Sequence, residues 1–336
     1  MASNKKIEEG IEHIRLAEKS LKTSLLKWRP DFEEAADEYN KAATCFRNAK
    51  SFEQCKDCLM KSADCHKQNR NLFYAAKALD QAITVCKELG DLREVGQLAD
   101  RAANMYMRHG SPETGAASLD KAAKILEQSH PEDALKLYHQ ASEIALIQDS
   151  TRQAAEYISK VARINVKLKK FDAAADAIRR EIGIHQQNES YQAMGRLAVA
   201  LVLVQLGRGD VVAAEKAFKE WGNCCEGAEV QTLEMLLQAY DEEDPDAARQ
   251  ALNNPFIKHM DVEYSILARD MPLPEGINIP QKPNVRENAT ASYVSPNSNN
   301  DQISPDQTST STPLASGDSK PPQVDEEEDE EDEGLC

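Results

Sequence analysis

The residues best suited to metal or redox chemistry stand close together near the N-terminus. Cys55 and Cys58 are separated by two residues, and Cys65 is followed directly by His66. Thiolates and imidazoles at such spacing are ligands that Zn²⁺ prefers, and a Cys-x2-Cys pair also suits thiol exchange. However, 52–66 reads as one continuous helix, without the turn that a zinc knuckle needs. We therefore expect Cys55 and Cys58 to pack as small apolar groups, with a zinc site as the alternative.

Other constellations that carry chemistry are missing from the sequence. It contains no Gly-x4-Gly-Lys-Ser/Thr loop that would cradle phosphates, and no Ser, His and Asp set is recognisable as a catalytic triad. We therefore expect no catalytic residue, no cofactor and no metal ion in this protein. Any nucleotide chemistry is expected to belong to a partner.

Small side chains recur about every 20 residues and indicate how the chain is built. A second small or apolar residue follows most of them after seven positions, which is two helical turns, so both sets lie on one stripe of a helix. Two units would make an antiparallel hairpin of about 40 residues, longer than a standard tetratricopeptide repeat. The pattern predicts an all-α, tetratricopeptide-like solenoid. The first set is Ala35, Cys55, Ala75, Val95, Gly115, Ala134, Ala154, Ala174 and Ala213, and the second is Ala42, Ser62, Ala82, Ala102, Ala122, Ala141 and Val161.

The repeat fades after Phe218, and the composition changes again near residue 271. We expect the solenoid over 1–225 and a capping helical bundle over 226–271, with three shorter helices over 229–240, 244–253 and 255–269. Residues 272–336 are rich in Pro, Ser and Asn and offer too little apolar surface to offset the entropy of ordering. This segment is predicted to be a disordered tail.

Nine consecutive acidic residues, 325–333, hold over half of the formal charge of −17. The rest of the chain is only mildly acidic and has no zinc-finger or recognition-helix pattern, which argues against nucleic-acid binding. The acidic run either solubilises the tail or binds a basic partner. The apolar Leu335 that follows it is not explained by solubility.

The apolar segments are short. The longest apolar run covers 197–204, far below the roughly 20 residues that a membrane-spanning helix requires. Residues 1–10 are charged and do not resemble a secretory signal. We expect a cytoplasmic protein whose cysteines are reduced thiols.

Three segments point to a known family. The stretches LKTSLLKWRPDF at 21–32, AADEYNKAA at 35–43 and FRNAK at 46–50 resemble the soluble NSF attachment proteins, or SNAPs, and within that family the gamma type. The resemblance covers about residues 7–270 and the acidic end with its penultimate leucine. The long insertion before the acidic run departs from the shorter tail of the family.

The resemblance implies an adaptor in vesicle traffic. Members of this family coat the SNARE four-helix bundle and recruit the hexameric ATPase NSF, which pulls the bundle apart after membrane fusion. No nucleic acid and no small-molecule substrate are implied. The alternative is a tetratricopeptide-like scaffold for another cytosolic trafficking or chaperone assembly.

The resemblance also implies contact residues. SNARE bundles are acidic, and Lys160 and Arg163 lie in a segment similar to one that carries a SNARE-facing lysine. Lys121 and Lys124, one hairpin earlier, are weaker candidates for the same surface. The alternative is that all four are ordinary solvated side chains.

Contacts with NSF and with the membrane are implied at the two ends of the chain. Asp241, Glu242 and Glu243, together with Leu335, are expected to meet the basic amino-terminal domain of NSF. Leu25, Leu26 and Trp28 lie among cations near the first turn, where apolar tips would enter a bilayer interface and give peripheral membrane contact. The alternative is that these three residues pack within the first hairpin.

Overall fold

A computed structural model describes residues 2–23 and 28–275. Helices joined by short turns make up most of these ranges. Within them it contains fifteen α-helices, one short 3-10 helix and no strand, which confirms the all-α prediction. The helices of the repeated part are α1 (Ala2–Leu21), α2 (Phe32–Asn48), α3 (Phe52–Gln68), α4 (Leu72–Leu89), α5 (Val95–His109), α6 (Pro112–Leu126), α7 (Pro131–Ile147), α8 (Thr151–Lys167), α9 (Phe171–Gln187), α10 (Tyr191–Arg208) and α11 (Val211–Trp221). They are followed by η1 (Gly222–Cys224), α12 (Gly227–Asp241), α13 (Pro245–Leu252), α14 (Pro255–Lys258) and α15 (Val262–Arg269).

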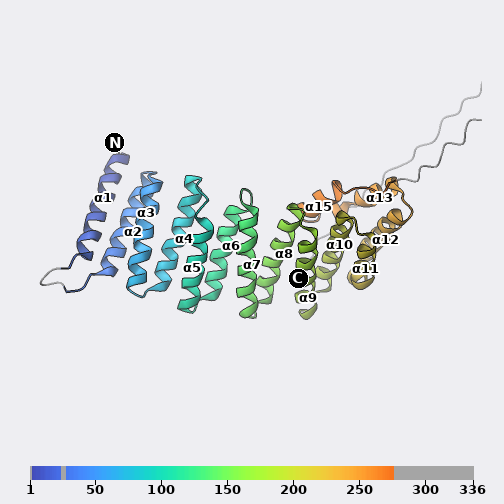
Figure 1. The fold of residues 1–336 in the computed structure, drawn as a ribbon, viewed down its shortest axis with the longest axis horizontal. Helices are drawn as coiled ribbons and strands as arrows, with labels where there is room; N and C mark the ends of the chain where they lie inside the picture. Colours follow the sequence, from blue (N-terminus) through green and yellow to red (C-terminus); the bar gives the residue numbers. More distant parts are fainter. Residues whose placement is uncertain (1, 24–27, 276–336) are drawn as a thin grey trace, which may run out of the picture. The chain divides into compact units, whose positions relative to one another are not determined.

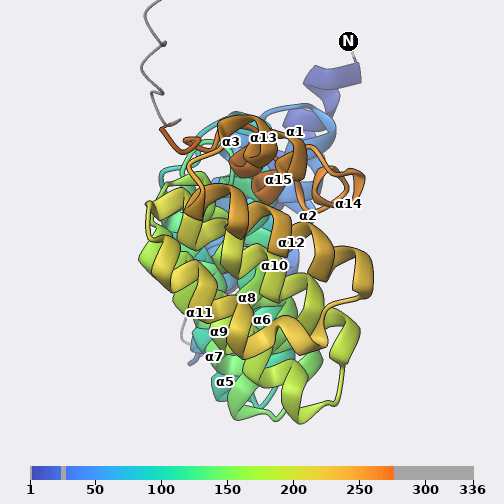
Figure 2. The ribbon, with the colours of Figure 1, turned by 90° about the vertical axis from the view of Figure 1, so that its right-hand side faces the viewer.

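Successive helices pack side by side as antiparallel hairpins, from α1 to α11 (Figure 1). Figure 2 shows the two layers that result, with α5, α7, α9 and α11 on one side and α6, α8 and α10 on the other. Each hairpin closes its core only by contact with its neighbours, as in other repeat proteins. The predicted hairpin solenoid is confirmed.

The small residues of the repeat lie where the helices approach most closely. The first set is buried except for Ala213, and the second set is buried in full. Gly115 shows how little space separates neighbouring helices. An added Cβ there would lie only 3.2 Å from the carbonyl oxygen of Ala103 in the preceding helix. Ala213 was assigned to the wrong position: α11 begins at Val211, so its fourth residue, Ala214, is the buried one.

Most of the repeated helices end in a left-handed residue. This residue is Gly90, Gly110 or Gly209 after three helices, but a side-chain-bearing residue after several others, such as Lys50 (φ 59°) and Lys169 (φ 57°). The left-handed conformation lets the following N–H bond back to the helix, as Ser51 N does to Phe46 O at 2.9 Å. Short turns of this kind keep consecutive helices adjacent.

The last helices fold back onto the end of the row. Helix α15 packs against both α8 and α10, which are far from it in sequence (Figure 1). Residues 255–269 form two helices rather than one. The backbone of Asp261 is extended (φ −51°, ψ 145°), which interrupts the helix before α15 begins at Val262. Met271 is buried and the Tyr240 hydroxyl donates to Pro272 O at 2.7 Å. The predicted tail otherwise lies outside the described residues.

Contacts divide the chain into Met1–Ile279 and Pro280–Cys336, so the helices belong to one unit. The proposed boundary between a solenoid and a capping bundle at 225/226 stays a prediction. No helix in the described part of the chain is long and apolar enough to cross a membrane.

Candidate functional site

Lys121, Lys124, Lys160 and Arg163, here called the cationic cluster, lie on two neighbouring helices of one layer. Lys121 and Lys124 are the tenth and thirteenth residues of α6, and Lys160 and Arg163 are the tenth and thirteenth of α8. Residues at equivalent positions of stacked repeats face the same way. The fold therefore brings the four predicted cations together on one face of the even-numbered helices.

Lys160 lies at the centre of the cluster, and its ammonium group is already paired with two carboxylates of the chain. Its Nζ donates to Asp120 Oδ1 at 2.7 Å and to Glu156 Oε1 at 2.8 Å, and its side chain is only 11% exposed. The rings of Tyr138 and Tyr157 flank the same Nζ, with centroids at 5.5 Å and 5.3 Å. Burial alone would lower the pKa of Lys160, but the two carboxylates outweigh it and raise the pKa, so the ammonium stays charged.

Asp120 joins the two helices of the cluster. Its second carboxylate oxygen accepts from Lys124 Nζ at 2.7 Å, so one carboxylate serves two of the four cations. Lys121, by contrast, is exposed and forms no ion pair within the part of the chain that the structure describes. Lys121 is therefore the member of the cluster whose charge is most available to a partner.

Arg163 connects the cluster to the C-terminal helices. Its Nη1 lies 3.5 Å from Asp261 Oδ1, at the start of α15, and its buried Nε has no hydrogen-bond partner among the described residues. The neighbouring Glu181 is buried, and this burial raises its pKa to about 8 against the weaker opposing effects of Ser159 and Arg163. Burial also raises the pKa of Tyr264, which lies in the same region. Arg163 thus helps to dock α15 onto α8.

The three predicted NSF-facing acids occupy the turn between α12 and α13 and are here called the acidic turn. Asp241 ends α12, and Asp241, Glu242 and Glu243 are all exposed. Glu243 is left-handed (φ 52°), and Gln238 Nε2 donates to Glu242 Oε1 at 2.7 Å. Three carboxylates in one exposed turn suit a basic partner. Leu335 lies outside the described residues, so its position relative to this turn is not defined.

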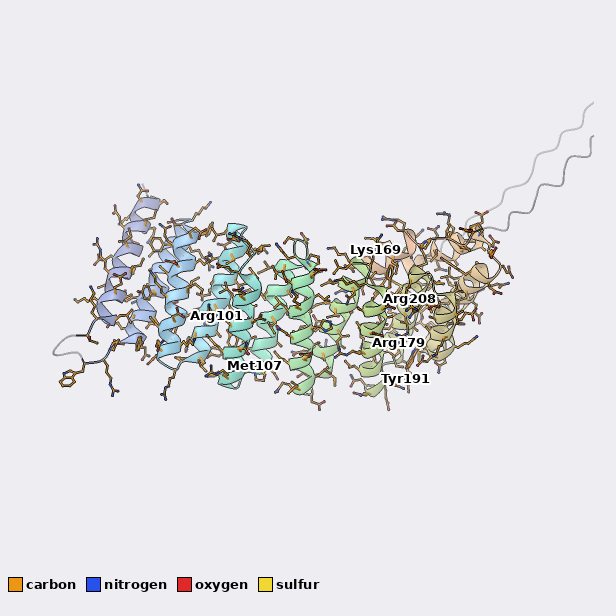
Figure 3. The ribbon with its side chains drawn as sticks, viewed as in Figure 1. Arg101, Met107, Lys169, Arg179, Tyr191 and Arg208 are labelled. Carbon is orange, nitrogen blue, oxygen red and sulfur yellow. The ribbon has the colours of Figure 1, made fainter. Side chains whose placement is uncertain are left out.

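Of the predicted membrane-contact residues, only Trp28 is described. Its side chain is 87% exposed, whereas Leu25 and Leu26 lie outside the described residues. Helices α3, α5, α7 and α9 end along one edge of the row, the lower edge in Figure 1. Other exposed apolar side chains, including Met107 and Tyr191, lie along this lower edge (Figure 3).

The early cysteines and histidine belong to the core of α3. Cys55, Cys58, Cys65 and His66 are buried, and Cys55 and Cys58 pack with the main apolar core as predicted. Burial raises the pKa of the Cys58 thiol to about 12, so this thiol is protonated and a poor ligand or nucleophile. Within the described residues no group of His, Cys, Asp and Glu is arranged to hold a metal ion.

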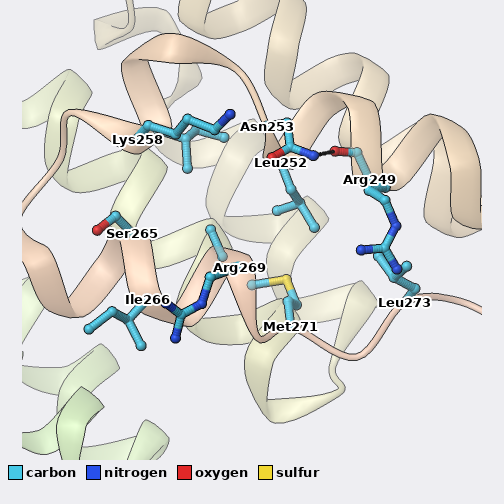
Figure 4. Close-up of a pocket in the computed structure, with 11 residues that line it drawn as sticks. Arg249, Leu252, Asn253, Lys258, Ser265, Ile266, Arg269, Met271 and Leu273 are labelled. Atoms are coloured by element: carbon cyan, nitrogen blue, oxygen red, sulfur yellow. Dashed lines mark hydrogen bonds between the residues drawn. The ribbon is translucent and has the colours of Figure 1, made fainter.

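A cavity of about 340 Å³ lies between α13, α14 and α15 and is lined by Arg249, Lys258 and Arg269 (Figure 4). Arg269 already makes two hydrogen bonds to the carboxylate of Asp270, at 2.7 Å and 3.0 Å. Arg249 contributes its carbonyl oxygen to Asn253 at 2.9 Å. The cavity has a cationic lining. None of its lining residues has a buried polar side-chain atom without a hydrogen-bond partner.

Sequence reasoning located the cations but missed the carboxylates that hold them. Asp120 is the ninth residue of α6, and the ninth residue of α4, Asp80, likewise accepts hydrogen bonds from Tyr106 and Ser118 on the next two helices. This recurrence of aspartate at one repeat position was a readable signal. Asp261 offered no such signal, because its pairing with Arg163 depends on how α15 folds back.

Comparison with known proteins agrees with this arrangement. The family model "Soluble NSF attachment protein, SNAP" matches residues 8–255. The gamma-soluble NSF attachment protein of Dictyostelium discoideum is 25% identical over 274 residues, which is 81% of this chain and 84% of that protein. The protein of the same name from Arabidopsis thaliana is 25% identical over 259 residues, 76% of this chain and 89% of that protein.

A solved structure, that of BtubC (BKLC) from P. vanneervenii, matches 67% of this chain and 91% of its own chain at 14% identity. Its TM-score of 0.36 is too low to carry an argument. The match of the family model over most of the helical unit is decisive, and the gamma names of the two relatives agree with the type expected from the sequence. The chain belongs to the soluble NSF attachment protein family.

Proposed function

We propose that this protein is an adaptor that binds SNARE four-helix bundles and recruits and stimulates the hexameric ATPase NSF for bundle disassembly. The observation that carries the proposal is the family match over residues 8–255. The helical unit supports it, because a row of hairpins offers a long surface to a rod-shaped partner. Its two charged regions, the cationic cluster and the acidic turn, suit an acidic bundle and a basic ATPase domain respectively.

We assign the SNARE contact to the cationic cluster, with Lys121 in the leading role. Lys160, Lys124 and Arg163 are each paired with a carboxylate of this chain, so a partner gains less from them than from Lys121. Lys121→Glu is expected to weaken SNARE-complex pull-down severalfold, as expected for a reversed interface charge. The matched control is Lys136→Glu on α7, another exposed lysine. Equal binding by both variants and the unmodified protein would remove the cluster from the interface.

We assign the NSF contact to the acidic turn together with Leu335. Opposite charge at the turn would guide docking, and the apolar Leu335 would add a contact that a purely acidic tail lacks. Leu335→Ala is expected to lower the stimulation of ATP hydrolysis more than it lowers NSF binding. Unchanged stimulation would exclude Leu335 from this role.

We propose that the protein is cytoplasmic and contacts membranes peripherally through Leu25, Leu26 and Trp28. The exposure of Trp28 favours this interpretation over packing within the first hairpin, since a packed tryptophan would be covered. Flotation with anionic liposomes tests it: the triple change to Ser should leave the protein in the soluble fraction. Helix content by circular dichroism shows whether the variant is folded.

One reconstitution tests the whole proposal against the alternative of an unrelated scaffold. The full-length protein is mixed with a SNARE complex and NSF, and the assembly is followed by gel filtration with a non-hydrolysable ATP analogue and then with ATP and Mg²⁺. The adaptor is expected to join a complex that dissociates on hydrolysis. A complex that never forms, or that ATP does not release, would favour the scaffold.

A further inference from the structure

A polar groove lies between α2 and α4, in the same helix layer as the cationic cluster. Its volume is about 460 Å³. Glu33 and Asp37 project from α2, Tyr74 and Lys77 from α4, and His66 of α3 lies at the floor. These five residues are here called the acidic groove. The cationic cluster lies two helices further along the same layer.

The two carboxylates of the acidic groove are not used by the fold. Glu33 and Asp37 are one helical turn apart on α2, are both exposed, and form no ion pair with any described residue. Most other acids on the repeated helices have a partner: Glu38 of α2, for example, accepts from His13 at 2.7 Å and from Lys41 at 2.6 Å. Like charges at this spacing repel each other. An unpaired pair of carboxylates is thus a cost that a bound cation would relieve.

His66 provides the second, independent sign of a ligand. His66 is only 6% exposed, yet its Nδ1 has no hydrogen-bond partner among the described residues. Burial lowers the pKa of His66, and Asp37 and Glu33 oppose this only in part, so the ring is neutral at pH 7. A neutral imidazole offers one nitrogen as an acceptor. A buried ring nitrogen without a hydrogen-bond partner is unfavourable, and His66 is one of the residues that line the groove.

Aromatic rings complete the walls of the acidic groove. The Tyr74 ring lies with its centroid 5.7 Å from that of His66 and is 51% exposed. Lys77 Nζ stands 6.0 Å from the Tyr74 centroid at the rim, but it makes no ion pair with Glu33, Asp37 or any other described residue. The groove therefore contains acceptors and ring faces, and its one resident cation stays at the edge.

The protein itself shows how such a set of groups is completed. In the cationic cluster, two carboxylates and two tyrosine rings surround the ammonium of Lys160. The acidic groove also has two carboxylates and two rings, and it lacks the enclosed cation. Because its three acceptors, Glu33, Asp37 and His66, come from two different helices, a donor with several N–H groups fits them better than a single ammonium. Guanidinium provides five N–H donors in a plane and also stacks on aromatic faces.

We propose that the acidic groove between α2 and α4 binds an arginine side chain of a partner polypeptide, with Glu33 and Asp37 pairing with the guanidinium, His66 accepting a hydrogen bond and Tyr74 stacking on it. This site is separate from the cationic cluster and the acidic turn, and it does not depend on the identity of the partners proposed above. It gives the protein a cation-recognising position in the same helix layer as the cationic cluster.

The test titrates the full-length protein with N-acetyl-L-arginine amide and follows the ring signals of its seven histidines by NMR, with His66 assigned from the His66→Gln variant. Saturable movement of the His66 signal is expected. N-acetyl-L-citrulline amide, which has the same shape without the charge, should bind about tenfold more weakly because it cannot form charge-assisted hydrogen bonds. Equal shifts with both probes would overturn the proposal.

Two variants locate the site. Glu33→Gln with Asp37→Asn should weaken arginine amide binding about tenfold, since both charged acceptors are lost. The matched control, Glu8→Gln with Glu12→Gln, removes two exposed acids at the same spacing on α1 and should bind as the unmodified protein does. Tyr74→Leu is a third variant, at an exposed position, and should weaken binding severalfold. Binding unchanged in the Glu33 and Asp37 variant, with unperturbed signals from the other histidines showing a folded protein, would refute the assignment.

Discussion

The cationic cluster and the acidic groove lie on one layer of helices, yet they use their charges in opposite ways. Asp120, Glu156 and Asp261 neutralise most of the cluster from within the chain, so its charges hold α6, α8 and α15 together. In the groove, Glu33 and Asp37 form no ion pair with any residue that the structure describes. Charge in a repeat protein can thus serve the fold in one pair of repeats and stay available in another.

Glu181→Gln has the largest expected effect, because Glu181 is a buried carboxyl group beside Arg163 of the cluster. Burial holds its pKa at about 8 in the folded protein, far above the ordinary glutamate value of 4.5. Between these two values the unfolded chain releases the proton and the folded protein keeps it, so the free energy of unfolding falls as pH rises through this window. The variant should remove that loss, a gain of about 3 kcal/mol near pH 7.

Urea unfolding from pH 5 to pH 9 measures this difference, and Glu8→Gln on α1 is the exposed control. His185 Nε2 lies 3.9 Å from Glu181 Oε1, Arg163 faces it from α8, and Asp261 and Tyr264 face it from α15. Burial lowers the pKa of His185 from its ordinary value. A variant whose stability keeps the slope of the unmodified protein would show that Glu181 is ionised at its site.

Lys160→Met has the next largest expected effect and tests whether the cluster serves the fold. The change leaves Glu156 and one oxygen of Asp120 without their cation, although Lys124 still pairs with Asp120. We expect a loss of about 2 kcal/mol in the free energy of unfolding, less than for a fully buried pair. Lys121→Met should change it by less than about 0.5 kcal/mol, because Lys121 is exposed.

Thermal and urea unfolding of the two variants provide the measurement. Equal stabilities would contradict this contrast, because they would show that Lys160 contributes no more to the free energy of unfolding than the exposed Lys121 does. The pair also separates two effects in a SNARE pull-down. Lys160→Met would reduce binding through a weakened helix packing, and Lys121→Met through the interface alone.

The fold was predictable because the information is local and repeated. Small residues at the fourth helical position, such as Ala35 and Ala174, determine both the period and the close packing of neighbours. The partners of the site residues were less predictable. The contact between Lys160 and Asp120 depends on the register of two helices that are not adjacent in sequence, and Arg163 meets Asp261 only because α15 folds back.

The acidic groove could not be inferred from sequence for a related reason. Glu33 and Asp37 read as ordinary solvated acids at the start of a helix, and His66 read as part of a cysteine-rich pattern. Only the packing of α2, α3 and α4 places the three side chains around one cavity. Whether a carboxylate has an ion-pair partner is decided by the packing of the folded chain. A sequence motif therefore does not show that Glu33 and Asp37 lack one among the described residues.

The smallest expected effect belongs to Glu33→Gln with Asp37→Asn, measured as stability. Relief of the repulsion between two acids one turn apart favours the variant, while the loss of a negative charge from the first turn of α2 disfavours it. These opposing effects should leave the free energy of unfolding within about 0.5 kcal/mol of its original value. Urea unfolding of this variant beside Lys160→Met sharpens the contrast between the two regions. A loss as large as that of Lys160→Met would mean that the groove carboxylates support the fold, and their availability to an arginine would then have to be abandoned.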